Sequence, residues 1–211
     1  DQKLGQLFIV ALYTNKGEDH ISNVRRIVEQ EQIGGLILMQ DDAAREITLV
    51  NEFQSKSKVP LMIGMDAEWG LFQRIAAAHK FPWAMTLGAI QDKNLITQMA
   101  AKIAEDSKRM GINWDFAPVV DVNTNPDNPI IGNRSFGSEV QNVINSALAY
   151  SNGLQDNRIL AAIKHFPGHG DTSTDSHFDL PVVAHNLDRL NAVELAPFKA
   201  LMDKGVGGVM V

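Results

Sequence analysis

Short apolar runs alternate with amphipathic stretches along the whole chain. Uninterrupted apolar runs of this length, rich in β-branched residues or glycine, are typical of strands that are buried on both faces. The runs that we predict as strands are residues 7–12, 35–39, 60–65, 112–120, 159–163 and 207–211. The chain therefore contains about six buried strands.

The stretches between these runs have the spacing of helices. In residues 94–110, apolar side chains such as Ile96 and Ile103 recur on one face of a helix. The other predicted helices are residues 21–31, 43–56, 139–154 and 187–204. Gly111 and Gly205 follow two of the helices, where glycine commonly ends a helix in a left-handed conformation.

Strands that alternate with helices predict a parallel sheet, either open and doubly wound or closed into a barrel. The glycine-rich phosphate turns typical of many doubly wound sheets, GxGxxG and GxxxxGK[ST], do not occur. Side chains suited to chemistry instead follow several different strands, as they do at one face of a barrel. We predict an α/β fold, a (β/α)8 TIM-type barrel. Residues 1–211 form part of that single domain, and we expect the remaining strands to lie beyond Val211.

Composition removes several classes of function. The chain has 45% hydrophobic and 21% charged residues and a net charge of -6, which disfavours binding to nucleic acid. It has no cysteine, which excludes disulfides, thiolate metal sites and a cysteine nucleophile. No apolar run approaches the ~20 residues of a membrane-spanning helix, so we expect no membrane span in this segment.

The densest group of titratable side chains lies in residues 164–177, directly after the predicted strand 159–163. This loop reads KHFPGHGDTSTDSH and holds three histidines, two aspartates and a lysine. A solvated loop with capping residues accounts for one histidine, but not for the whole cluster. We therefore expect a functional site here.

Two kinds of site fit this loop. His165, His169 and His177 would be enough for a catalytic zinc, although their spacing matches no standard zinc helix. Alternatively, Asp175 lies two residues before His177 and can orient its imidazole, which would then transfer protons as a general acid and base.

Other candidates stand at strand ends or in loops. Asp66 follows the strand 60–65, where a barrel places substrate-binding groups, but a helix N-cap fits equally well. Glu68 suits either an ion pair or a carboxylate that supports the residues in contact with the substrate, and Trp69 suits either packing or a platform for a sugar ring. Asp121 fits a turn cap. Taken alone, Arg74 and Arg134 are only weak indications of a site, because a lone arginine is most often a surface charge.

The loop 164–177 resembles the signature loop of the β-N-acetylglucosaminidases of glycoside hydrolase family three. Other segments resemble the same family, in the family's order. They are residues 4–7, 34–38, 66–70, 115–122 and 134–137. The resemblance therefore extends over essentially the whole chain.

This resemblance implies a retaining glycosidase that works without a metal or other cofactor, through a covalent glycosyl-enzyme. The general acid/base would be His177, paired with Asp175. The nucleophile would be an aspartate on a later strand, beyond Val211, so we expect residues 1–211 to be inactive alone. The substrate would carry terminal β-linked N-acetylglucosamine, as in peptidoglycan or chitin fragments. The source would be bacterial, with cytoplasm and periplasm both open.

The resemblance also assigns residues that bind the sugar. They are Asp66, Arg74, Arg134, Lys164 and His165. His169 and Asp171 would shape the loop or support its acid/base. One departure is Leu71, which stands where the family often has an arginine, and it affects the expected substrate preference.

Three alternatives remain open at this stage. A β-glucosidase or a phosphorylase of the same family would share the fold, and an imidazole tolerates an anionic acceptor such as phosphate better than a carboxylate does. An inactive carbohydrate-binding module would use the same hydroxyl-binding groups. A metallohydrolase would use the histidines.

Overall fold

The computed structural model describes residues 2–40, 42–173 and 181–211. Its six strands form one sheet in which each strand pairs in parallel with the next along the chain. The strands are β1 (Ile9–Leu12), β2 (Gly35–Leu38), β3 (Met62–Met65), β4 (Trp114–Asp115), β5 (Leu160–Ile163) and β6 (Gly208–Val209). This sequential parallel order is that of a (β/α)8 barrel, which confirms the predicted α/β class.

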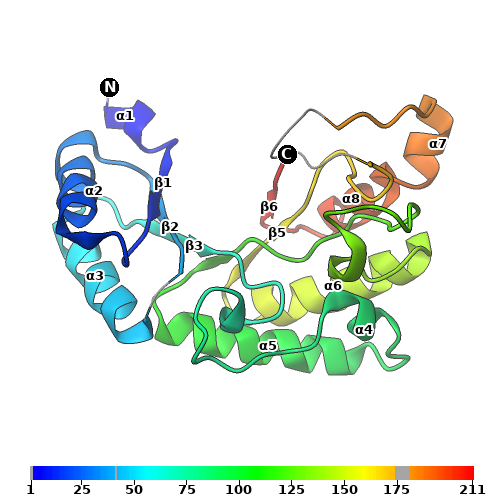
Figure 1. Ribbon diagram of the computed structural model, residues 1–211, viewed down its shortest axis with the longest axis horizontal. Helices are drawn as coiled ribbons and strands as arrows, with labels where there is room; N and C mark the ends of the chain where they lie inside the picture. Colours follow the sequence, from blue (N-terminus) through cyan, green and yellow to red (C-terminus); the bar gives the residue numbers. More distant parts are fainter. Residues whose placement is uncertain (1, 41, 174–180) are drawn as a thin grey trace.

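The longer helices follow strands and lie on the outer side of the curved sheet, while β1 and β6 lie at its opposite ends (Figure 1). The longer helices are α2 (Gly17–Glu31), α3 (Ala43–Lys56), α5 (Asn94–Arg109), α6 (Val140–Gln155) and α8 (Leu195–Met202). The shorter ones are α1 (Gln2–Gly5), α4 (Ala84–Gly88) and α7 (Leu187–Ala192), and 3-10 turns span Leu71–Gln73 and Gly132–Arg134. None of these helices is long and apolar enough to cross a bilayer, within the described part of the chain.

Helices α5 and α6 pack closely against each other. Ala100 and Ile103 of α5 are fully buried, as the apolar period predicts. A Cβ atom added to Gly153 of α6 would lie 2.4 Å from the carbonyl oxygen of Thr97 and 2.6 Å from Cβ of Ala100. Gly153 therefore permits the close approach of the two backbones.

Two of the predicted elements are interrupted at prolines. The helix expected over residues 187–204 is two helices, α7 and α8, separated at Val193, whose φ of -125° and ψ of -70° are not helical. In a continuous helix the ring of Pro197 would clash with the carbonyl of Val193, whereas Pro197 fits in the first turn of a new helix.

The strand expected over residues 112–120 is confined to β4. Pro118 lacks an N–H group and cannot donate to the ladder between strands. Beyond it, Val119 forms an isolated parallel bridge with Lys164. The segment after β4 thus continues beside the end of β5 and leads into the loops that form the site.

Candidate active site

Charged side chains from the carboxyl ends of several strands meet in one cavity of about 340 Å³. Asp66 and Glu68 follow β3, Lys164 and His165 follow β5, and Arg134 ends the 3-10 turn after β4. The complete lining is Asp66, Glu68, Gln73, Arg74, Ile130, Arg134, Lys164, His165, His169 and Met210. These groups therefore lie together at the carboxyl ends of the strands, the face of a barrel at which we expected the site.

Lys164 links the two carboxylates that follow β3. Its Nζ donates to Asp66 Oδ1 at 2.8 Å and contacts Glu68 Oε1 at 2.9 Å. Lys164 is only 2% exposed and Glu68 only 6%. Because buried charges are tolerated only when they are paired, these contacts hold all three side chains in fixed positions.

Two arginines complete this ion-paired group. The guanidinium of Arg134 donates to both carboxylate oxygens of Glu68, at 3.0 and 2.7 Å, and Arg74 donates to Asp66 Oδ2. Burial by itself would raise the pKa of both carboxyls. Lys164 together with Arg134 lowers the pKa of Glu68, and Lys164 together with Arg74 lowers that of Asp66. Both are therefore ionised at neutral pH and act only as hydrogen-bond acceptors.

Asp121 anchors the histidine loop. Its Oδ2 lies 2.7 Å from His165 Nδ1, and its carboxylate accepts from the backbone N–H of His165 at 3.2 Å and of His169 at 2.7 Å. The Nε2 atom of His165 lies 3.2 Å from Nη2 of Arg134. The sequence indicated only a turn cap at Asp121, because its partners lie more than 40 positions further along the chain.

Asp115 is fully buried and is not among the residues that line the cavity. Its Oδ1 accepts from the backbone N–H of Ala67 at 3.0 Å, and Oδ2 has no partner among the described residues. Burial raises the pKa of Asp115 to about 7. Tyr150 supports the same segment, since its hydroxyl donates to the carbonyl oxygens of Ala67 and Glu68 at 3.1 and 3.2 Å.

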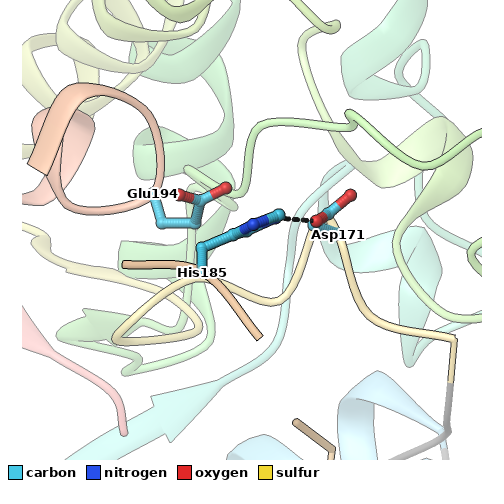
Figure 2. A group of neighbouring side chains, drawn as sticks. All are labelled: Asp171, His185 and Glu194. Atoms are coloured by element: carbon cyan, nitrogen blue, oxygen red, sulfur yellow. Dashed lines mark hydrogen bonds and ion pairs between the residues drawn. The ribbon is translucent and has the colours of Figure 1, made fainter. Parts of the chain in front are cut away.

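Asp171 lies in a second cluster, with His185 and Glu194 (Figure 2). Potential ligand atoms of these three residues lie within 4.8 Å of one another, a set that suits a divalent cation. However, Nε2 of His185 is hydrogen-bonded to Asp171, and Arg189 donates to Glu194 at 3.0 Å. Contacts within the protein therefore engage His185 Nε2, Asp171 and one oxygen of Glu194, whereas Glu194 Oε2 has no hydrogen-bond partner among the described residues.

The protonation of Asp171 follows from its contacts. Burial acts to raise the pKa of its carboxyl, but hydrogen bonds from His185 and from Thr124, the latter at 3.0 Å, bring the pKa below its ordinary value. Asp171 therefore ties the segment after β4 to the segment before α7. It is not among the residues that line the cavity.

The described histidines of the alternative zinc set already have partners. Nδ1 of His165 contacts Asp121, and Nδ1 of His169 contacts the hydroxyl of Thr172. Burial lowers the pKa of His169, whose Nε2 has no partner within the described ranges. The third histidine of the set, His177, lies outside those ranges.

The structure brings together the five residues expected to bind a sugar, which are Asp66, Arg74, Arg134, Lys164 and His165. His169 joins them in the lining. The expected acid/base pair, Asp175 and His177, lies outside the described residues. Glu68 forms the ion pairs that were expected of it, and Trp69 packs on Trp83 with ring centroids 4.2 Å apart.

Comparison with known proteins agrees with this architecture. The sequence matches the Glycosyl hydrolase family 3 N terminal domain over residues 1–211. Beta-hexosaminidase A of Pseudoalteromonas piscicida is 38% identical over 198 residues, which are 88% of this chain and 33% of that protein.

Two solved structures have the same fold. A family 3 β-N-acetylglucosaminidase from Paenibacillus sp. str. FPU-7 is 36% identical with a TM-score of 0.92, and the match covers 100% of this chain and 41% of that one. A β-glucoside phosphorylase is 26% identical with a TM-score of 0.92, over 99% of this chain and 37% of that one. The chain thus spans well under half the length of these relatives. It belongs to glycosyl hydrolase family 3, and its six parallel strands are a portion of that family's N-terminal (β/α)8 barrel.

Proposed function

We propose that the protein containing this chain is a retaining glycosidase that releases terminal β-linked N-acetylglucosamine from glycans of the peptidoglycan or chitin type. The observation that carries the proposal is the cavity at the strand ends, where two ionised carboxylates lie among three cationic side chains. Such a cavity suits a sugar, because each hydroxyl both donates and accepts a hydrogen bond. The names of the relatives supply the choice of N-acetylglucosamine.

Within this cavity, we assign the carboxylate of Asp66 to accept hydrogen bonds from sugar hydroxyls. Lys164, Arg74 and Arg134 donate to hydroxyl oxygens. Because the ion pairs fix these donors and acceptors before a sugar arrives, little conformational entropy is lost on binding. His165 contributes from the loop that follows β5.

The chemistry would take place in two steps at the anomeric carbon. First, His177 protonates the glycosidic oxygen while a carboxylate from outside residues 1–211 attacks the anomeric carbon, which breaks the bond to the leaving group. Then His177 takes a proton from water, whose oxygen attacks the same carbon and releases the sugar and the carboxylate. Asp175 orients the imidazole of His177 and stabilises its protonated form.

Hydrolysis of a chromogenic β-N-acetylglucosaminide by the full-length protein tests the proposal. We expect activity in the parent and a loss of about 10²- to 10⁴-fold in His177→Ala, the range for a lost general acid/base. His79→Ala, which removes an exposed histidine from another loop, is the matched control and should keep the parent rate. A His177→Ala variant that is as active as the parent would exclude the assigned acid/base.

Phosphorolysis is the second candidate, because a β-glucoside phosphorylase shares this fold. Assays of β-N-acetylglucosaminide and β-glucoside with and without phosphate separate the two reactions. Phosphate-dependent formation of a sugar 1-phosphate would establish the phosphorylase. If calorimetry detects binding of N-acetylglucosamine but neither substrate is turned over, the protein is a carbohydrate-binding module instead.

A further inference from the structure

We propose that Asp121 is a positioning residue that holds His165 in the Nδ1–H tautomer and so presents the lone pair of Nε2 to the cavity. This inference deepens the proposed function and rests on it, because it concerns how the sugar-binding histidine is prepared. Its structural part, the tautomer of His165, is measurable without any sugar.

The environment of Asp121 fixes the proton on Nδ1. Asp121 is only 1% exposed, and its carboxylate already accepts from the backbone N–H groups of His165 and His169. An ionised carboxylate offers only acceptor oxygens. The 2.7 Å contact between Asp121 Oδ2 and His165 Nδ1 therefore requires the proton to sit on Nδ1, which donates it to the carboxylate.

The other ring nitrogen of His165 gives the same result independently. Nε2 lies 3.2 Å from Nη2 of Arg134, and a guanidinium has donors but no acceptor. Arg134 cannot turn away easily, because its Nε and Nη2 atoms also bind both oxygens of Glu68. The contact is favourable only if Nε2 is unprotonated and accepts from Arg134.

These contacts define what His165 can do in the cavity. Nε2 is an acceptor with one lone pair, which faces Arg134 Nη2 at 3.2 Å in the sugar-free protein, so a sugar hydroxyl that donates to Nε2 must share or displace that contact. Asp121 also fixes the backbone at both His165 and His169, and it thereby sets the position of the ring. Loss of the carboxylate would both free the tautomer and shift the ring, and would thereby weaken the contact between His165 and the sugar.

The first experiment records the ¹⁵N resonances of the His165 ring in the full-length, sugar-free protein at neutral pH. These resonances are assigned to His165 through its sequence neighbours, Lys164 and Phe166. We expect a protonated, pyrrole-type Nδ1 and an unprotonated, pyridine-type Nε2. A proton on Nε2 instead of Nδ1, or on both nitrogens, would overturn the proposal. This measurement needs no variant and no activity.

The second experiment compares Asp121→Asn with Ser135→Ala. The hydroxyl of Ser135 donates to the backbone carbonyl of Asp121 at 2.6 Å and is fully buried, so its loss disturbs the same loop without touching the carboxylate. We expect Asp121→Asn to change the His165 resonances and to lower kcat/KM by roughly 10-fold, the size of about one lost hydrogen bond to the sugar, mainly through KM. Ser135→Ala should lower the melting temperature and leave the wild-type tautomer in place.

Unchanged His165 resonances and unchanged KM in a folded Asp121→Asn variant would show that Asp121 does not position this ring. If Asp121→Asn does not fold, the tautomer of the parent still decides the question. If the parent shows the expected tautomer but turns over no sugar substrate, the proposed function fails while the assignment of Asp121 and His165 stands.

Discussion

Asp115 shows at the residue scale how the fold sets the charge state of a carboxyl group. It is fully buried, its only described hydrogen bond comes from the backbone of Ala67, and burial raises its pKa to about 7. An aspartate in an unfolded chain has a pKa of about 3.9. The folded state therefore keeps a proton on Asp115 over a pH range in which the unfolded state has lost it.

This difference predicts a pH-dependent effect of Asp115→Asn. Since the folded pKa is raised, the contribution of Asp115 to stability is fully present below about pH 4 and is lost as the pH rises through about 7. Asparagine does not titrate, so the variant lacks this loss of stability. As the pH rises from about 4 to 8, the free energy of unfolding of the variant should therefore increase by ~2–4 kcal/mol relative to that of the parent. Urea unfolding across this range measures it, and parallel pH curves for the two proteins would contradict the assignment.

Asp115 and Asp121 also show which parts of the site the sequence could not predict. The expected sugar-binding residues were identified because they follow recognisable strands or match a family segment. The roles of Asp115 and Asp121, and the identity of the cations that pair with Glu68, depend on partners distant in sequence, such as Arg134, which lies 66 positions after Glu68. Only the parallel pairing of the strands brings these groups together, so no local spacing reveals them.

At the scale of elements, the contact between α5 and α6 depends on Gly153. Glycine in a helix costs about 1 kcal/mol relative to alanine, so helix propensity alone predicts that Gly153→Ala stabilises the protein. The packing predicts the opposite, because the new Cβ would meet the Thr97 carbonyl oxygen at 2.4 Å, and this neighbour is backbone.

We therefore expect Gly153→Ala to lower the free energy of unfolding by about 1–3 kcal/mol, the usual cost of overpacking. Chemical denaturation provides the measurement. Asn145→Ala, at an exposed position of the same helix, is the matched control and should be neutral or slightly stabilising. A Gly153→Ala variant as stable as the parent, or more stable, would show that α5 and α6 do not need a glycine at their contact.

Apolar periodicity predicted elements well where side-chain packing decides the structure. The predicted helix over residues 43–56 has the same bounds as α3. The predicted helix over residues 94–110 differs from α5 by one residue, because α5 ends at Arg109. Apolar periodicity failed after β4 and between α7 and α8, where the side chains remain compatible with one element but Pro118 and Pro197 prevent the backbone hydrogen bonding of a continuous one. Hydrophobic pattern and backbone hydrogen bonding are separate constraints. Near these two prolines, backbone hydrogen bonding determines where the strand and the helix end.

At the scale of the whole molecule, the six strands form an open sheet with β1 and β6 at its ends (Figure 1). Large apolar side chains are exposed around β1, with Leu7 77% and Phe8 62% accessible. Unpaired parallel edges and contiguous exposed apolar side chains promote association with other chains. Full (β/α)8 barrels close this edge with further strands.

The last prediction compares residues 1–211 alone with the full-length protein. We expect the isolated segment to self-associate in light scattering, to bind a hydrophobic dye and to hydrolyse no β-N-acetylglucosaminide.

Phe8→Lys should reduce self-association of the segment, because it places a charge in the exposed patch. In the full-length protein the same change should be destabilising if further strands cover that patch, since it would bury an unpaired charge. Leu95→Lys, at an exposed position on α5, is the control and should have little effect in either protein. A segment that remains monomeric, binds no dye and turns over substrate would show that these six strands need no further covering to form the site.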